Sequence, residues 1–85
     1  MLRKNLSQKA VHPIDRHIGM QLRRFRKLHG ITQADLACRI GVTSQQLQKY
    51  EKGINRLSCS RLYTISKELN IPLPHFLAAY EDPIN

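Results

Sequence analysis

The chain has 85 residues, a formal net charge of +8 and a hydrophobic content of 41%. This length fits one small domain and excludes a two-domain enzyme with a large cleft, and the hydrophobic content excludes a wholly disordered chain. No segment approaches the roughly 18 consecutive apolar residues of a membrane span. The first residues, Met-Leu-Arg-Lys-Asn-Leu, lack the apolar core of a secretion signal. We therefore expect a cytoplasmic protein with no membrane partner.

The positive charge is concentrated in the first third of the sequence. Residues 1–30 carry eight lysines and arginines against Asp15 alone, whereas residues 58–85 carry two basic residues against three acidic ones. Such asymmetry is typical of a protein that turns one face to a polyanion. The alternative is a basic surface that is merely solvated.

Residues 1–13 lack apolar periodicity, and we interpret them as a basic N-terminal arm. A helix is predicted to begin near Asp15, a residue type that caps helices, and to stop at Gly30, which tolerates the left-handed conformation. The apolar face of this helix follows the spacing of a single helical stripe. It comprises Ile18, Leu22, Phe25 and Leu28.

Two short helices are predicted between residues 32 and 53. Each follows a threonine that can cap it, Thr32 or Thr43, and each is followed by a glycine that can end it. The small side chain of Ala37 would let the second helix cross closely over the first, and Leu47 would fill the angle between them. These are the requirements of a helix-turn-helix, in which two helices meet at a steep angle.

Two more helices are predicted in the remaining sequence, and no strand. One begins after Ser58 and ends at Asn70. A final short helix follows the prolines at 72 and 74, and its apolar residues are Leu73, Phe76, Leu77 and Tyr80. The expected fold class is therefore all-α, a compact bundle of five short helices. We divide the chain into the arm (1–13), a helix-turn-helix domain (14–80) and a C-terminal tail (81–85).

Four segments of the sequence carry a family resemblance. They are Gln33-Ala-Asp-Leu-Ala, Gly41-Val-Thr, Tyr50-Glu-Lys-Gly and Leu69-Asn-Ile-Pro-Leu. Together they resemble the lambda-repressor-like helix-turn-helix family (Cro-like, XRE-type) over residues 17–78. The resemblance implies a DNA-binding transcriptional regulator that recognises an operator sequence and acts at the nucleoid. Its expected partner is double-stranded DNA, and a homodimer is expected because one short helix reads only a few base pairs.

The resemblance, together with the chemistry of the DNA grooves, assigns roles to individual side chains. A glutamine amide can pair with adenine, and a lysine can reach guanine or a phosphate. The expected base-reading residues are Ser44, Gln45, Gln48 and Lys49. The expected phosphate contacts are Arg23, Lys27, Gln33, Thr43, Lys52, Asn55 and Arg56. The resemblance also implies a buried ion pair between Arg26 and Glu51, which has a structural role.

No pattern in the sequence indicates catalysis, a metal site or a cofactor. The histidines lack zinc-ligand spacing with Cys38 and Cys59, which are interpreted as reduced thiols. The six acidic residues form no catalytic pair, and no glycine-rich phosphate loop is present. We therefore expect a protein that is not an enzyme and that binds no metal and no cofactor.

Two alternative functions remain open from the sequence. The chain could be an antitoxin or adaptor that binds a protein partner, such as a toxin or polymerase, and autoregulates its own promoter. Residues 1–30 could instead bind polyanions or anionic membranes without base selectivity. The candidate dimer interface is the final apolar segment (Leu73, Phe76, Leu77 and Tyr80). Within it, Phe76 and Leu77 are interpreted as core residues, as is Tyr50 earlier in the chain.

Overall fold

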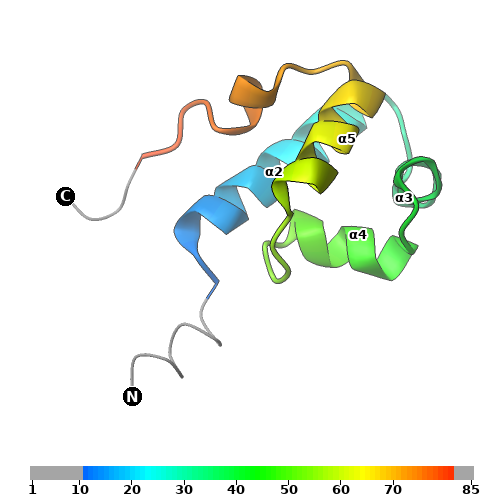
Figure 1. Ribbon diagram of the computed structural model, residues 1–85, viewed down its shortest axis with the longest axis horizontal. Coiled ribbons are helices and arrows are strands. Elements are labelled where there is room, and N and C mark those ends of the chain that lie inside the picture. The colour runs from blue at the N-terminus through cyan, green and yellow to red at the C-terminus, as the bar shows by residue number, and fades with distance from the viewer. Residues whose placement is uncertain (1–10, 82–85) are drawn as a thin grey trace.

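A computed structural model describes residues 11–81, which form four α-helices and one 3₁₀-helix (Figure 1). The elements are α2 (Pro13–Leu28), α3 (Gln33–Ile40), α4 (Ser44–Glu51), α5 (Cys59–Leu69) and η1 (Leu73–Phe76). The all-α class is confirmed for these residues. Most of the predicted arm, including Arg3, Lys4 and Lys9, and residues 82–85 of the predicted tail lie outside the described residues.

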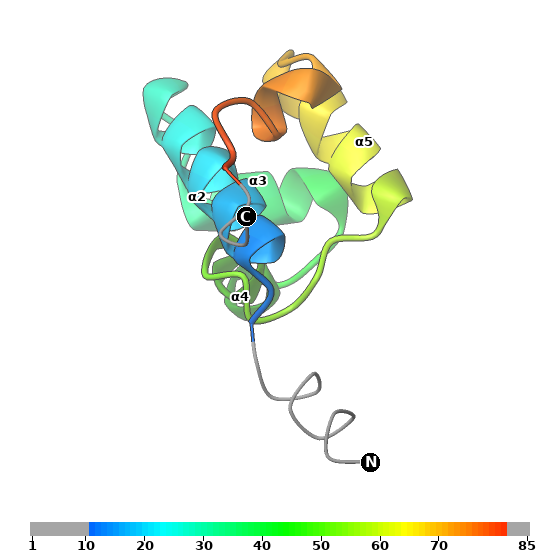
Figure 2. The same ribbon diagram turned by 90° about the vertical axis from the view of Figure 1, so that its left-hand side faces the viewer.

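The helices α3 and α4 cross at a steep angle, as a helix-turn-helix requires. Figure 1 shows α3 nearly end-on and α4 lengthwise, and in Figure 2, turned by 90°, α3 is the one seen lengthwise. Helix α2 packs against α4, and α5 packs against α3. The 3₁₀-helix η1 contacts both α2 and α5 and closes the side of the bundle away from α4.

The predicted starts of α3, α4 and α5 are confirmed at the level of single hydrogen bonds. The hydroxyls of Thr32, Thr43 and Ser58 each accept the backbone N–H three residues later, at 3.0–3.1 Å. Helices α3 and α5 end where Gly41 and Asn70 adopt the left-handed conformation. Each of these caps satisfies backbone groups that the helix itself leaves unpaired.

The core gathers side chains from all five elements. Its buried members are Leu22, Phe25, Leu36, Ala37, Ile40, Leu47, Ile65, Leu69 and Phe76. The rings of Phe25 and Phe76 meet edge to face with centroids 5.2 Å apart, an arrangement that aromatic pairs prefer. The core interpretation of Phe76 is therefore confirmed, and Tyr50 packs against the core while remaining partly exposed.

Two predictions about α2 are wrong. The helix begins at Pro13 with His12 as N-cap, so Asp15 lies within the first turn and does not cap it. Proline suits this position because the first helical N–H has no partner inside the helix. Leu28, which was predicted to lie on the apolar face, is 69% exposed, whereas Arg26 is buried. In a helix with 3.6 residues per turn, two residues that are two positions apart point in nearly opposite directions. Burial of Arg26 therefore leaves Leu28 on the solvent side.

The C-terminal prediction is also corrected. In place of a fifth α-helix the chain forms η1, stabilised by backbone hydrogen bonds that span three residues. Ala79 adopts a positive φ of 66°, which ends any helical path. Leu77, interpreted as core, is 49% exposed because it follows η1 on a turn of the chain. Among the helices described, none is long and apolar enough to cross a membrane.

Candidate nucleic-acid interface

One face of α4 is turned to solvent and the opposite face is buried. Gln45, Gln48 and Lys49 are exposed, and Lys52, directly after the helix, continues the same face. These positions follow helical spacing of three, four and seven residues, so their side chains lie in one stripe. Leu47 and Glu51, four residues apart on the opposite face, are buried. The helix is therefore braced from behind and presents a polar, basic stripe.

Three further side chains at the start of α4 are less exposed or already bonded. Ser44 and Gln46 are half-buried at the flanks of the stripe. The Thr43 hydroxyl accepts the Gln46 N–H at 3.0 Å and so serves as the helix cap. Because this bond uses the hydroxyl oxygen as an acceptor, the O–H of Thr43 can still donate to another group.

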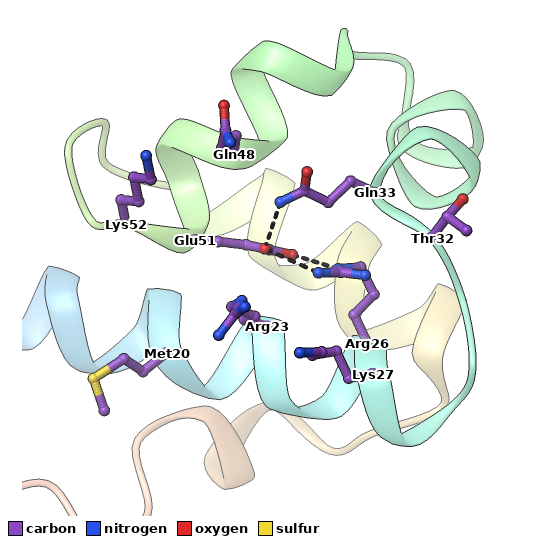
Figure 3. A pocket seen from close by; sticks show the side chains of 9 residues that line it. All are labelled: Met20, Arg23, Arg26, Lys27, Thr32, Gln33, Gln48, Glu51 and Lys52. Carbon is purple, nitrogen blue, oxygen red and sulfur yellow. Dashed lines mark hydrogen bonds and ion pairs between the residues drawn. The ribbon is translucent and has the colours of Figure 1, made fainter.

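A groove of about 710 Å³ is lined by α2, the start of α3 and the end of α4. Five of the residues expected to contact DNA line it: Arg23, Lys27, Gln33, Gln48 and Lys52. Figure 3 shows Gln48 and Lys52 on the α4 side of the groove, Arg23 and Lys27 on the α2 side, and Gln33 entering from α3. The three basic side chains are all exposed. This groove, the α2–α4 groove below, has the chemistry of an anion-binding surface.

A buried ion pair lies between the walls of the α2–α4 groove (Figure 3). Arg26 Nε donates to Glu51 Oε2 at 2.6 Å, and its Nη2 donates to Oε1 at 3.2 Å. The side chains of the pair are only 10% and 2% exposed. Arg26 Nη1 donates to the carbonyl oxygen of Ile31 at 2.8 Å, and Gln33 Nε2 donates to Glu51 Oε1 at 2.9 Å. The expected Arg26–Glu51 pair is thus present, and it ties α2, α3 and α4 together.

This network changes what Gln33 can do. One amide N–H of Gln33 is used by Glu51, which fixes the side chain on the rim of the α2–α4 groove. The second N–H of the amide remains for an outside acceptor. A phosphate contact by Gln33 therefore stays a prediction, now with a defined donor.

The remaining predicted phosphate contacts lie in the loop that follows α4. Asn55 is half-buried and Arg56 is exposed. Arg56 Nε donates to Asp15 Oδ2 at 3.0 Å, so the loop is tied to the first turn of α2. This ion pair has no local signal in the sequence, because the two residues are far apart in the chain.

Close contact between α2 and the end of α4 depends on two glycines that were not among the predicted site residues. A Cβ on Gly19 would lie 2.4 Å from the Tyr50 carbonyl oxygen, and one on Gly53 would lie 2.7 Å from Arg16 Cα. Real Cβ atoms do not approach backbone so closely, so both positions require glycine. The signal in the sequence was Gly19 itself, a glycine inside an otherwise helical pattern.

The described residues offer no metal-binding cluster. No group of three or more His, Cys, Asp or Glu residues that could hold a metal ion occurs within residues 11–81. Cys38 and Cys59 are both free and exposed. Cys59 is the first residue of α5, as predicted.

Comparison with known proteins places this architecture among regulators. A family model described as Helix-turn-helix matches residues 22–76. An "uncharacterized transcriptional regulator in ATPase CF(0) region" from Rhodospirillum rubrum is 45% identical over 73 residues, which are 86% of this chain and 68% of that protein. Several further curated relatives, named as HTH-type transcriptional regulators, are longer, and the chain spans about half of their length.

Two solved structures share the fold. The clp gene regulator ClgR from C. glutamicum matches with a TM-score of 0.72 and 26% identity, over 75% of this chain and 83% of that one. The biofilm master regulator SinR, solved in complex with DNA, matches with a TM-score of 0.65 and 26% identity, over 71% of this chain and 97% of that one. With the crossed α3–α4 pair and the exposed stripe of α4, these matches show that the chain belongs to the lambda-repressor-like (XRE-type) helix-turn-helix family of transcriptional regulators.

Proposed function

We propose that this chain binds an operator in double-stranded DNA by inserting α4 into the major groove. The observation that carries the proposal is the exposed stripe of Gln45, Gln48 and Lys49, supported from behind by buried Leu47 and Glu51. A single α-helix fits the major groove, where each base pair presents a distinct pattern of donors and acceptors. The similar fold of SinR, solved in complex with DNA, supports this reading.

Base recognition falls to the N-terminal half of α4. The Gln45 amide both donates and accepts, so it can pair with N6 and N7 of adenine. Lys49, one turn later on the same stripe, can reach guanine O6 and N7. Ser44 and Gln48 flank this pair and complete the proposed base-reading set.

Phosphate contacts position the stripe on the DNA. The exposed cations of the α2–α4 groove, Arg23, Lys27 and Lys52, would face one sugar-phosphate strand. Thr43 and Gln33, at or beside the N-termini of α4 and α3, add neutral donors, and Asn55 and Arg56 extend the contact beyond the end of α4. Such contacts supply affinity and orientation without sequence information.

Operator binding is proposed to require two copies of the chain. One recognition helix reads only a few base pairs, and paired helices read half-sites about 34–36 Å apart. Leu73 and Leu77, both exposed, are the proposed interface residues that the core does not use. Occupancy of an operator would change polymerase access, so the protein would act on the nucleoid in the cytoplasm.

Selection of bound fragments from random duplex DNA tests the proposal. The expected result is an enriched motif of two half-sites, and Gln45→Ala is expected to lose about 1–3 kcal/mol of discrimination at one base position. Gln46→Ala is the matched control, because it removes the same side chain from the neighbouring position, which lies outside the proposed base-reading set. Absence of any enriched motif, with binding retained, would support the polyanion-binding alternative. Full discrimination by the Gln45→Ala protein would refute the assignment of base reading to Gln45.

A further inference from the structure

The loop that follows α4 is held in place from two sides. The N–H groups of Ile54 and Asn55 both donate to the Lys49 carbonyl oxygen, at 3.0 and 3.4 Å. Gly53, with a φ of +76°, lies directly against the backbone of residues 15 and 16 at the start of α2. The backbone that carries Arg56 is therefore fixed to both α4 and α2.

Among the residues that the structure describes, the Arg56 side chain has one hydrogen-bond partner. Its Nε donates to Asp15 Oδ2 at 3.0 Å, and the two side chains are 63% and 17% exposed, respectively. A guanidinium carries five N–H donors, and Nε accounts for one of them. The four N–H groups on Nη1 and Nη2 make no hydrogen bond to residues 11–81. They remain free to donate to an outside acceptor.

We propose that Asp15 is a positioning residue for DNA binding, which holds the Arg56 guanidinium so that its free N–H groups meet a backbone phosphate. The inference rests on the proposed function and goes beyond it, because Asp15 itself would touch no DNA. An arginine side chain loses considerable rotamer freedom when it is fixed. Because Asp15 fixes Arg56 before DNA arrives, less of that cost is left for binding.

A positioning role for Asp15 and a purely electrostatic role predict opposite changes in DNA affinity when Asp15 is neutralised. Asp15 is an anion near a surface that would face a polyanion, so its neutralisation should tighten DNA binding if charge were its only role. If Asp15 positions Arg56, neutralisation should weaken binding, because the phosphate contact is lost or loosened. The direction of the change therefore separates the two roles.

The experiment measures affinity for one mixed-sequence duplex of about 20 base pairs, or two helical turns, across a range of salt concentrations. Asp15→Asn is expected to raise Kd about 3- to 10-fold, the order of the cost of immobilising one flexible side chain on binding. In a plot of the logarithm of the association constant against the logarithm of salt concentration, the slope is expected to become shallower by about 0.9, the value for one phosphate. Asp15→Glu, which retains the carboxylate, is expected to restore most of the affinity.

Two controls isolate the role of Asp15. Asp35→Asn removes a carboxylate that also lies in the first turn of a helix and also pairs with an arginine, Arg39 at 3.1 Å. It should leave Kd unchanged or lower it. In an Arg56→Ala background, Asp15→Asn should no longer weaken binding, because the group it positions is absent.

The outcomes distinguish this inference from the proposed function. If the wild-type chain bound duplex DNA without salt dependence, both would fail. If Arg56→Ala lowered the salt slope but Asp15→Asn left slope and Kd unchanged, or tightened binding, only the positioning role would be overturned. A lower Tm of Asp15→Asn with an unchanged slope would also overturn it, because that result describes a purely structural ion pair.

Discussion

Gly19 on α2 lies so close to Tyr50 on α4 that an added Cβ would be 2.4 Å from the Tyr50 carbonyl oxygen. The same Cβ would be 2.6 Å from the carbonyl oxygen of Glu51. Both neighbours are backbone atoms, which cannot rotate away as a side chain can. The spacing between α2 and α4 at this point therefore depends on a glycine.

Gly19→Ala tests this contact. Helix propensity alone predicts that alanine inside a helix is more stable than glycine, by roughly 1 kcal/mol. The steric contact predicts the opposite, a loss of at least about 1–3 kcal/mol, because α2 and α4 must move apart. Urea denaturation measures the free energy of unfolding. Gly30→Ala is the control: its Cβ would meet nothing within 4 Å, so only backbone strain is expected. A stabilised Gly19→Ala protein would contradict the contact.

The Arg26–Glu51 pair is expected to behave as a buried ion pair. Glu51→Ala or Arg26→Ala should each cost about 3–5 kcal/mol, because the remaining charge is left buried without its partner. Replacing both residues with apolar side chains of similar size should cost less than either single change. Thermal or urea unfolding of the three variants checks this. Losses of a few tenths of a kcal/mol in the single variants would show that the pair is effectively solvated.

Lys52 is expected to contact phosphate and not bases. Lys52→Ala should weaken binding to all DNA sequences about equally and reduce the salt slope by about one. Lys67→Ala is the control, since Lys67 lies on α5 with its ammonium 5.7 Å from the centre of the Tyr63 ring. Titration of labelled duplexes of two different sequences, at several salt concentrations, measures both quantities. A loss of affinity for only one of the two duplex sequences would indicate that Lys52 contacts bases.

Substitution of the two neighbouring residues Phe76 and Leu77 should change the free energy of unfolding by very different amounts. Phe76→Ala is expected to cost about 3–5 kcal/mol, because the ring is fully buried against Phe25. Leu77→Ala should change the free energy of unfolding by less than about 0.5 kcal/mol, as is usual for an exposed side chain. Sedimentation of the Leu77→Ala protein reports whether self-association is weakened. Equal losses of stability in the two variants would show that Leu77 is a core residue like Phe76.

Local chemistry in the sequence was enough to predict most of the fold. Thr32, Thr43 and Ser58 predicted three helix starts because a capping hydroxyl acts on the N–H groups of its own first turn. Gly41 and Asn70 predicted helix ends for the same local reason. Helical spacing placed Leu47 inside and Gln45 outside, because a period of 3.6 residues divides any short helix into two faces.

The sequence failed where distant segments compete for the same space. Leu28 fitted the apolar stripe of α2, but the buried position went to Arg26, since Glu51 from another helix neutralises it. Asp15 has the chemistry of a helix cap, yet the helix begins at Pro13 and the Asp15 carboxylate pairs with Arg56.

By itself, then, the sequence determined the helices, their caps, the basic charge and the outward face of α4, because these depend on neighbours within one or two turns. Only the tertiary structure decided that Arg23, Lys27 and Gln33 share a groove with Gln48 and Lys52, and that Gly19 and Gly53 allow α2 to touch the end of α4. Such relations depend on how close two helices come, and that distance is set by side chains far apart in the chain.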